Sequence, residues 1–331
     1  MNTNKVLSFG ELLLRLQSES AHFFTDKENS LRLFTGGSEA NVAVALAQLG
    51  ISSEYMTAIP DQNSLAKEAL TEIQKQGVAT QKTILKGCRL GSYFLQSKNG
   101  LTKGEVIYDR AFSGFSQLSG ADLNMDVIFR DVTWFHWTAI TPGLSAEMAS
   151  LLRQLLEEAE KRSIFISVDL NYRSKLWKYG KKPSEIMPPL VEKCDVIMGN
   201  IWADQIFLET PLPKTLERDT KKETYFEAAN QSARFIFGNF PKCKHIAHTF
   251  RFMDNEKHNL LYGTYHTPHG NYLSTSYETH ELIDRIGSGD AFMAGLIYGI
   301  IKEDNGQNIV EKATQTGFAK LFVEGDFGIK K

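Results

Sequence analysis

Cysteine is scarce in this chain of 331 residues: Cys88, Cys194 and Cys243 are far apart, and no Cys-x-x-Cys spacing occurs. We therefore expect neither a structural disulfide nor a cysteine metal site, and reduced thiols are typical of a cytoplasmic protein. The eight histidines also lack a clear ligand spacing, because His245 and His248 would point to opposite sides of a predicted strand. The sequence thus leaves the metal ligands unassigned.

A strong net charge and long apolar runs are also absent. The chain has 39 acidic and 37 basic residues, and its densest basic stretch is short, from Lys178 to Lys182. No apolar run approaches the roughly 20 residues that a membrane-spanning helix needs. These features argue against nucleic-acid and membrane partners.

The chain does contain 42% hydrophobic residues, enough to bury the core of one large α/β domain over residues 1–331. After about residue 130, short β-branched and aromatic runs alternate with segments of helical periodicity, and Ser145 is a predicted helix cap. This alternation predicts a mostly parallel central sheet flanked by helices. The predicted strands are Val132–Trp137, Ile164–Leu170, Val196–Met198 and His245–Thr249.

A different pattern precedes residue 130. Leu90–Gln96 and Glu105–Tyr108 are strand-like, and Lys98-Asn99-Gly100 between them contains Asn-Gly, a strong hairpin-turn signal. We expect these two strands to belong to a small separate sheet. Further along, Glu209–Lys222 is rich in Pro, Thr and charge and is predicted to be a surface loop.

Gly36 and Gly37 precede an Ala-rich helical segment that stops at Gly50. Paired glycines let a ligand approach the backbone closely, and the start of a helix presents free N–H groups. Asn41 lies one turn into this helix and is placed to hydrogen-bond sugar hydroxyls. Taken alone, such a turn is more often architecture than a binding site.

A second glycine turn, Gly287-Ser288-Gly289-Asp290, opens an apolar helix late in the sequence. Its backbone N–H groups and the helix dipole make it an anion hole suited to a transferring phosphoryl group. A carboxylate at this positive end is explained if Asp290 removes the proton from an attacking hydroxyl. The alternative is that Asp290 only caps the helix. A dinucleotide fingerprint fits less well, because Phe292 stands where the third glycine is required.

The two segments together, Gly36-Gly37-x-x-x-Asn41 and Asp284-x-x-Gly287-Ser288-Gly289-Asp290-x-Phe292-x-x-Gly295, resemble the two signatures of ribokinase-like carbohydrate kinases. The resemblance spans nearly the whole chain. It implies a ribokinase-like α/β fold, ATP and Mg²⁺ as cofactors, a small-molecule sugar substrate, and a lid sheet from about residues 11–35 and 88–112. Lid sheets of this family often form subunit interfaces, so we expect a homo-oligomer.

Within this family the most similar group is the 2-keto-3-deoxygluconate kinases, above all in Asp169-Leu170-Asn171-Tyr172-Arg173-Ser174-Lys175-Leu176-Trp177. This resemblance implies ATP-dependent phosphorylation of the terminal hydroxyl of that sugar acid, with Asp290 as the base. Gly287, Ser288 and Gly289 would form the anion hole. The implied substrate contacts are Gly36, Gly37, Asn41, Tyr93, Tyr108, Arg110 and Arg173.

The residues themselves agree in part with these roles. A substrate carboxylate calls for a fixed guanidinium, and Arg173 follows a predicted strand at the end where α/β sheets bind ligands. Arg110 would approach from the lid side. Taken singly, each arginine is more often part of a surface ion pair than of a binding site, and the pair gains weight only from the family context. Tyr93 and Tyr108 are equally compatible with packing in the small sheet.

The chain departs from the family where Asn-x-x-Glu often follows the strand ending near residue 199. Here the segment is Asn200-Ile201-Trp202-Ala203-Asp204, with Ala203 at the Glu position and Asp204 as a candidate to organise metal-bound water. The resemblance places the adenine near residues 306–317. The implied nucleotide contacts are Asn200, Thr249, Arg251, Gly287 and Gly289.

Two other functions stay open. A kinase of the same family that acts on fructose, ribose or a nucleoside would need no acid-binding arginine. A non-catalytic sugar-binding relative would fit Ala203, whereas the intact Gly287, Gly289 and Asp290 favour an enzyme.

Overall fold

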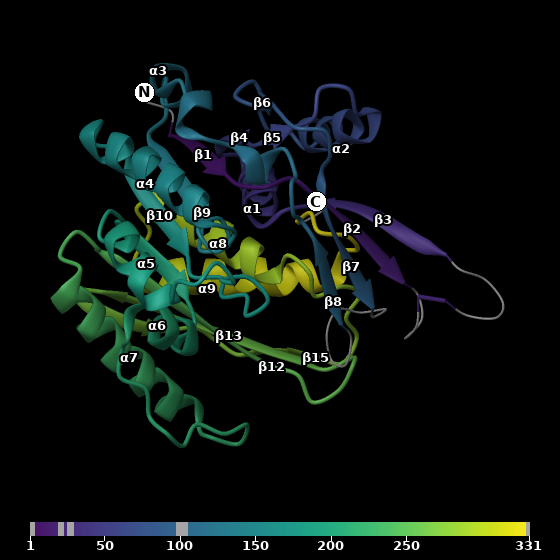
Figure 1. The fold of residues 1–331 in the computed structure, drawn as a ribbon. Helices are drawn as coiled ribbons and strands as arrows, with labels where there is room; N and C mark the ends of the chain where they lie inside the picture. The colour runs from purple at the N-terminus through teal and green to yellow at the C-terminus, as the bar shows by residue number, and fades with distance from the viewer. Residues whose placement is uncertain (1–3, 19–22, 25–29, 97–104, 329–331) are drawn as a thin grey trace.

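The computed structural model describes residues 4–18, 23–24, 30–96 and 105–328, which form a large and a small sheet with helices around the large one (Figure 1). In the large sheet, the neighbouring strands from β4 to β12 run parallel, and β13, β14 and β15 extend the sheet in antiparallel fashion. The strands, in spatial order, are β14 (Gly270–Leu273), β13 (Asn259–Thr267), β12 (His245–Phe252), β11 (Val196–Gly199), β10 (Phe165–Asp169), β9 (Trp134–Thr138), β1 (Lys5–Phe9) and β4 (Ser52–Met56), with β15 (Tyr277–Thr279) paired to β13.

Helices cover both faces of this sheet, which gives three layers (Figure 1). One face carries α1 (Ser38–Gln48), α8 (Ser288–Ile301) and α9 (Gly306–Ala319). The other carries α4 (Ala146–Lys161), α5 (Pro183–Val191), α6 (Ile201–Leu208) and α7 (Lys222–Asn239). The remaining elements are α2 (Ser64–Lys75), α3 (Met125–Ile128), the strand pair β5 (Ala58–Ile59) and β6 (Ile84–Leu85), and three 3₁₀ turns at Phe115–Gln117, Gly120–Asp122 and Lys320–Phe322.

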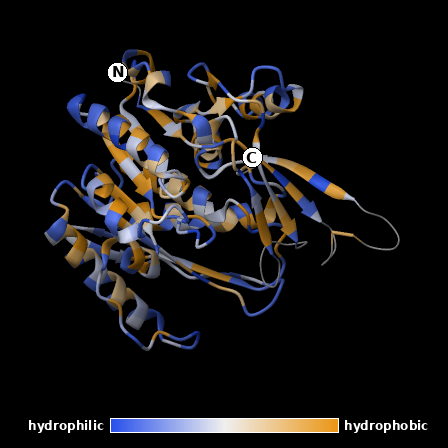
Figure 2. Ribbon diagram, viewed as in Figure 1, coloured by the Kyte–Doolittle hydropathy of each residue, from blue (hydrophilic) through white to orange (hydrophobic). Residues whose placement is uncertain are grey.

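Neighbouring residues of the buried strands supply the two cores. Val6 packs with α1, α8 and α9, whereas Leu7 packs against the α4 to α7 side. Trp134 and Phe135 divide between the two cores in the same way. Because side chains alternate across a strand, a strand covered on both faces needs apolar residues at successive positions, and Figure 2 shows the hydrophobic colour along the central strands.

The small sheet stands beside one end of the large one (Figure 1). Its strands, in order, are β3 (Leu31–Gly36), β2 (Leu13–Ser18), β7 (Gly91–Gln96) and β8 (Val106–Asp109). β7 and β8 pair antiparallel, which confirms the two predicted strands. The predicted turn at Lys98-Asn99-Gly100 lies outside the described residues.

The structure confirms the mostly parallel sheet and the predicted helices. Ser145 caps α4 by accepting a hydrogen bond from the Met148 N–H, and α1 and α8 begin at the two glycine turns. One difference concerns the C-terminal third. β12 runs past Thr249 to Phe252 because the antiparallel strand β13 pairs along its full extension. Residues 306–317, near which the resemblance places the adenine, belong to helix α9, which packs on α8. No helix in the described ranges is both long enough and apolar enough to cross a bilayer.

Candidate active site

A cleft of about 820 Å³ lies between the small sheet, the C-terminal ends of β10 and β11, and the start of α8. This is the edge of a parallel sheet at which α/β proteins bind ligands. Of the predicted site residues, only Gly36 is not on its wall; a β-carbon there would come within 2.3 Å of Asp326 Oδ1. The predicted residues that line the cleft are Gly37, Asn41, Tyr93, Tyr108, Arg110, Arg173, Asn200, Thr249, Arg251, Gly287, Ser288, Gly289 and Asp290.

The Gly287 turn has the backbone of an anion hole. Gly287 has a φ of 81°, and a β-carbon there would lie 2.4 Å from the Asp326 carbonyl oxygen, so glycine is required on both counts. The N–H groups of Gly289 and Asp290 have no acceptor in the part of the chain that the structure describes. Ser288 Oγ donates to the Gly317 carbonyl at 2.8 Å, so the side chain of Ser288 serves packing with α9. The backbone of this turn is what remains for an anion.

Asp290 lies in the first turn of α8 and is held at both carboxylate oxygens. Ser38 Oγ donates to Oδ1 at 2.5 Å, and Asn41 Nδ2 donates to Oδ2 at 2.7 Å. Asn171 Nδ2 in turn donates to Ser38 Oγ at 3.1 Å. Burial raises the pKa of Asp290, and the two hydrogen bonds partly oppose this rise. The carboxylate is therefore fixed in orientation and more basic than an ordinary aspartate.

Asn41 has a second feature that bears on sugar binding. Its Oδ1 atom is buried and has no hydrogen-bond partner within the described residues. A buried acceptor without a donor is costly, and a hydroxyl of a bound ligand would satisfy it. The amide thus orients the base with one atom and leaves the other for a donor in the cleft.

Asp169, at the C-terminal end of β10, is a further acidic group on the cleft wall. Burial raises its pKa well above the usual value, the charge of Asp290 raises it further, and Arg173 opposes the rise. Its carboxylate has no hydrogen-bond partner across the described ranges. The sequence offered a signal for this residue, because Asp169 begins the segment that carries the closest family resemblance.

Three guanidinium groups on the cleft wall form its cationic side. Arg251 is exposed within the cleft. Its pKa is lowered to about 10, mainly because the surrounding protein reduces its hydration and also because Arg173 and Arg285 repel its charge. Arg285 Nη2 donates to three backbone carbonyls of the β12–β13 turn, whereas Arg173 is exposed and has no partner among the described side chains. A site that concentrates positive charge in this way is suited to a polyanion.

The opposite end of the cleft contains residues of the small sheet. Tyr93 donates a hydrogen bond of 3.1 Å from its hydroxyl to Asp326 Oδ1, and Arg15 Nε lies 3.0 Å from Asp326 Oδ2. Burial raises the pKa of Asp326 to about 6, and Arg15 opposes this rise. No local pattern in the sequence indicated that Asp326 would meet these residues, so it was missed.

Arg110 is less available than the sequence suggested. Its Nε and Nη2 atoms both lie 2.6 Å from Glu11 Oε2, and the pair is almost fully buried. Nη1 has no partner in the described part of the chain. Arg110 therefore enters the cleft wall with its charge already balanced.

The segment after β11 does not supply a metal-binding carboxylate. Asn200 Oδ1 caps α6 by accepting from the Ala203 N–H at 2.9 Å. Asp204 is fully buried and accepts from Ser232 at 2.6 Å, while His248 Nε2 lies 2.7 Å from it. The structure thus contradicts a role for Asp204 in organising metal-bound water. None of residues 306–317 lines the cleft, so the structure gives no support to the expected adenine position.

Comparisons with known proteins agree with this geometry. The profile of the pfkB family carbohydrate kinases matches residues 3–223. A 2-dehydro-3-deoxygalactonokinase of Haloferax volcanii is 27% identical over 329 residues, which covers 99% of this chain and 94% of that protein. A crystal structure of 2-dehydro-3-deoxygluconokinase from Thermotoga maritima has a TM-score of 0.88 and 30% identity, covering 99% of this chain and 96% of that one.

A more distant structure comes from E. coli and was solved in complex with ATP and Mg²⁺. It has a TM-score of 0.76 and 16% identity, and the match covers 98% of this chain and 94% of that one. This likeness shows a shared fold. The family profile spans most of the chain and includes both Gly37 and Arg173. With the glycine turn, the fixed carboxylate and the cationic cleft in place, the chain belongs to the pfkB family of carbohydrate kinases.

Proposed function

We propose that the protein is an ATP-dependent kinase of 2-keto-3-deoxygluconate that transfers phosphate to the terminal hydroxyl, giving the 6-phosphate and ADP. The observation that carries this proposal is Asp290: a buried carboxylate, held at both oxygens, beside two backbone N–H groups that lack acceptors. A general base next to an anion hole is what transfer of a phosphoryl group to a hydroxyl requires.

In this mechanism Asp290 accepts the proton of the attacking hydroxyl. Ser38 and Asn41 fix the direction of its carboxylate, so the hydroxyl oxygen is presented in one orientation. The N–H groups of Gly289 and Asp290 stabilise negative charge that develops on the phosphoryl oxygens. Burial of Asp290 favours proton acceptance, since the raised pKa makes the carboxylate a stronger base.

The preference for a sugar acid is proposed on the basis of Arg173. Arg110 is neutralised by Glu11 and Arg285 is held by backbone carbonyls, which leaves Arg173 and Arg251 as exposed guanidinium groups on the cleft wall. We assign Arg251 to the phosphates and Arg173 to the substrate carboxylate. Lys175, two residues later, donates to the Val106 carbonyl and pairs with Glu105 Oε1, and so joins this loop to β8 of the small sheet. A carboxylate held there by Arg173 would lie next to the lid.

ATP and Mg²⁺ are proposed as cofactors. Arg251 and the Gly287 turn are suited to the phosphates, and an E. coli protein of this fold was solved with both ATP and Mg²⁺. Mg²⁺ prefers oxygen ligands and is commonly bound by one or two carboxylates together with substrate phosphates. Asp169 fits this requirement, because its buried carboxylate has no other partner in the described residues and a cation would favour its charged form. Mg²⁺ would supply charge neutralisation of the transferred phosphate.

A homo-oligomer is also proposed. Leu31 and Leu33 of β3 and Ile107 of β8 keep 40–50% of their surface exposed on the small sheet. Exposed apolar side chains in one sheet favour contact with a second copy. Light scattering that returns the mass of a single 37.3 kDa chain at micromolar concentration would contradict this proposal.

The decisive experiment for the activity is a coupled ADP-release assay over 2-keto-3-deoxygluconate, 2-keto-3-deoxygalactonate, fructose, ribose and a nucleoside. We expect the highest kcat/KM with one of the two sugar acids. A preference for fructose, ribose or the nucleoside would overturn the acid-specific assignment and leave a neutral-substrate kinase of the family. Binding of a sugar acid without turnover of any compound would indicate a non-catalytic relative.

A further inference from the structure

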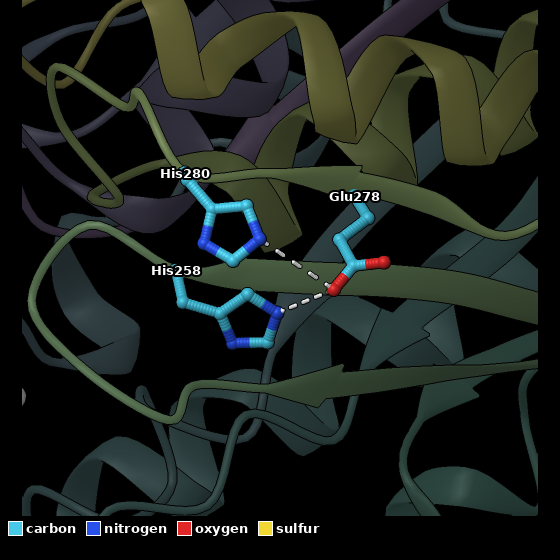
Figure 3. Close-up of side chains that lie close together, drawn as sticks. All are labelled: His258, Glu278 and His280. Atoms are coloured by element: carbon cyan, nitrogen blue, oxygen red, sulfur yellow. Dashed lines mark hydrogen bonds and ion pairs between the residues drawn. The ribbon is translucent and has the colours of Figure 1, made fainter.

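Three side chains outside the cleft form a cluster of potential metal ligands: His258, Glu278 and His280 (Figure 3). Each offers one ligand atom, and these atoms all lie within 4.8 Å of one another. His258 Nε2 lies 2.9 Å from Glu278 Oε1, and His280 Nε2 lies 4.0 Å from the same oxygen. In Figure 3 both imidazole rings are directed toward that carboxylate.

Strand pairing explains why residues 22 positions apart meet. β13 and β15 are antiparallel, with Asn259 opposite Thr279 and Leu260 opposite Glu278. One step further along the same register places His258 opposite His280, and their rings are 5.0 Å apart. Glu278 and His280 are two positions apart on an extended segment, so they share a face. The sequence spacing alone concealed this arrangement.

One ligand is already held in position. The His258 ring is 1% exposed, and its Nδ1 atom accepts a 3.1 Å hydrogen bond from the Asp254 backbone N–H and also lies 3.1 Å from Asp254 Oδ2. Asp254 is fixed by a two-pronged interaction with Arg218, at 2.7 and 2.9 Å. In this arrangement Nε2 carries the ring proton and donates to Glu278 Oε1, so a metal at Nε2 replaces that proton, and in the metal-bound form Nδ1 is placed to take up a proton and donate to Asp254 Oδ2. A carboxylate behind a metal-binding imidazole is a common arrangement in metalloproteins.

We propose that His258, Glu278 and His280 bind one divalent transition-metal ion of the zinc class. Two imidazoles and a carboxylate suit Zn²⁺, Co²⁺ or Ni²⁺, whereas Mg²⁺ and Ca²⁺ prefer oxygen ligands alone. Bonds of about 2.0–2.2 Å require ligand atoms closer together than the widest separation here. Glu278 and His280 are 55% and 70% exposed at their side chains and are free to close in on the ordered His258.

This site is connected to the active site by Arg285. Its Nη2 atom donates to the carbonyls of Asn255, Glu256 and His258, at 3.2, 2.8 and 2.8 Å. Arg285 comes two residues before Gly287, the start of the anion hole. A metal bound to His258 and to the two ligands at β15 would therefore restrict the motion of the β12–β13 turn, whose carbonyls accept hydrogen bonds from Arg285.

The test uses the full chain, freed of metal, and titrates it with Zn²⁺ by calorimetry and with Co²⁺ by visible absorption, without nucleotide. We expect one Zn²⁺ per chain, a Co²⁺ spectrum typical of nitrogen and oxygen ligands, and a rise in Tm on adding Zn²⁺. Asp254→Asn removes a supporting partner of His258 and should weaken Zn²⁺ binding by about 10- to 100-fold. His280→Gln removes a ligand and should weaken it by at least as much. His269→Gln, at another exposed histidine, is the matched control and should bind as wild type.

Location is checked by hydrogen exchange. Zn²⁺ should protect amides of residues 253–258 and 277–281 in the wild type, and His280→Gln should lose that protection while its kinase activity without Zn²⁺ stays unchanged. Equal Zn²⁺ affinity in the wild type and His280→Gln would overturn the proposal, as would protection confined to other segments. Absence of stoichiometric binding would show that His258 and Glu278 form a hydrogen-bonded pair only.

Discussion

Asn41 Nδ2 donates a 2.7 Å hydrogen bond to Asp290 Oδ2, although the two residues are 249 positions apart in the sequence. The contact joins the first turns of α1 and α8, the two helices that begin at the glycine turns. The helix with the candidate base is thereby tied to the helix with the candidate sugar-binding amide. In the proposed mechanism, orientation of the base and binding of the substrate therefore depend on the same side chain.

Replacing Asp290 tests the base directly. Asp290→Asn keeps the size of the side chain but cannot accept the proton, so we expect kcat to fall by about 10²- to 10⁴-fold with little change in sugar or ATP affinity. Steady-state kinetics with the best substrate of the panel measure this. Asp304→Asn, at an exposed position, is the control. Near-wild-type turnover in Asp290→Asn would reduce Asp290 to a helix cap.

Asn41 should set the pH dependence. The acidic limb of kcat/KM reflects protonation of the base, and activity falls as pH falls through the pKa of Asp290, which burial raises above the ordinary aspartate value. The Asn41 hydrogen bond favours the charged carboxylate and lowers that pKa, so Asn41→Ala should move the limb to higher pH. A merely structural loss would lower kcat/KM without moving the limb. Asn239→Ala, exposed on α7, should leave the profile unchanged.

Arg173 should determine the choice between acid and neutral substrates. Loss of a charge-assisted hydrogen bond costs about 1.5–3 kcal/mol, so Arg173→Met should weaken apparent affinity for the sugar acid by about 10- to 100-fold. The KM for ATP should barely change. Equal losses for sugar acid and neutral sugar would contradict the carboxylate role, and a rise confined to the KM of ATP would assign Arg173 to the phosphates. Arg153→Met, on the exposed face of α4, serves as the control.

The small sheet should close over bound sugar, because phosphoryl transfer must exclude attack by water. Hydrogen exchange of β7 and β8, within residues 88–112, should slow when the sugar acid is added and should not respond to ATP alone. Lys175→Met removes the contacts with Glu105 and Val106 and should reduce the sugar-dependent protection. If sugar leaves the exchange of both strands unchanged, the sheet is not a lid.

Stability should decrease in mild acid because of buried histidines. Burial lowers the pKa of His136 to about 3, and its Nδ1 lies 3.0 Å from Ser167 Oγ. The folded-state pKa is below the unfolded value of about 6.5, so stability is unaffected above that pH and falls as pH decreases from 6.5 toward 3. At pH 5 the loss from His136 is up to about 2 kcal/mol. Urea unfolding at pH 7 and 5 should show a smaller difference for His136→Gln than for wild type and for the exposed control His269→Gln.

Much of this architecture could be predicted because the information is local. Several elements can be recognised from about ten consecutive residues: the strand that ends in Asp169, the helix capped by Ser145 and the two glycine turns. Residues at the carboxyl ends of parallel strands lie at the ligand-binding edge of a sheet, so Arg173 could be placed there from the sequence. Its common site with Gly287 was implied by the family resemblance.

Other contacts could not be foreseen, because they depend on pairings over long distances. The neutralisation of Arg110 by Glu11, the contact of Tyr93 with Asp326, and the register that joins His258 to His280 have no local signature. Asp204 is a further example. It was expected near the cleft, but its side chain is buried and contacts His248 instead. In each case the partner is set by tertiary packing rather than by the flanking residues.

The long separation of Asn41 and Asp290 also bears on how the protein is made. A ribosome adds about 5–20 residues per second, so roughly 10 to 50 s pass between synthesis of the two residues. During that time Asn41 and Ser38 lack the carboxylate that they hold in the finished fold. The parallel strands before α8 can pair as they emerge, but the proposed reaction centre forms only after α8 has left the ribosome. A nascent chain would therefore acquire its sheet well before this site.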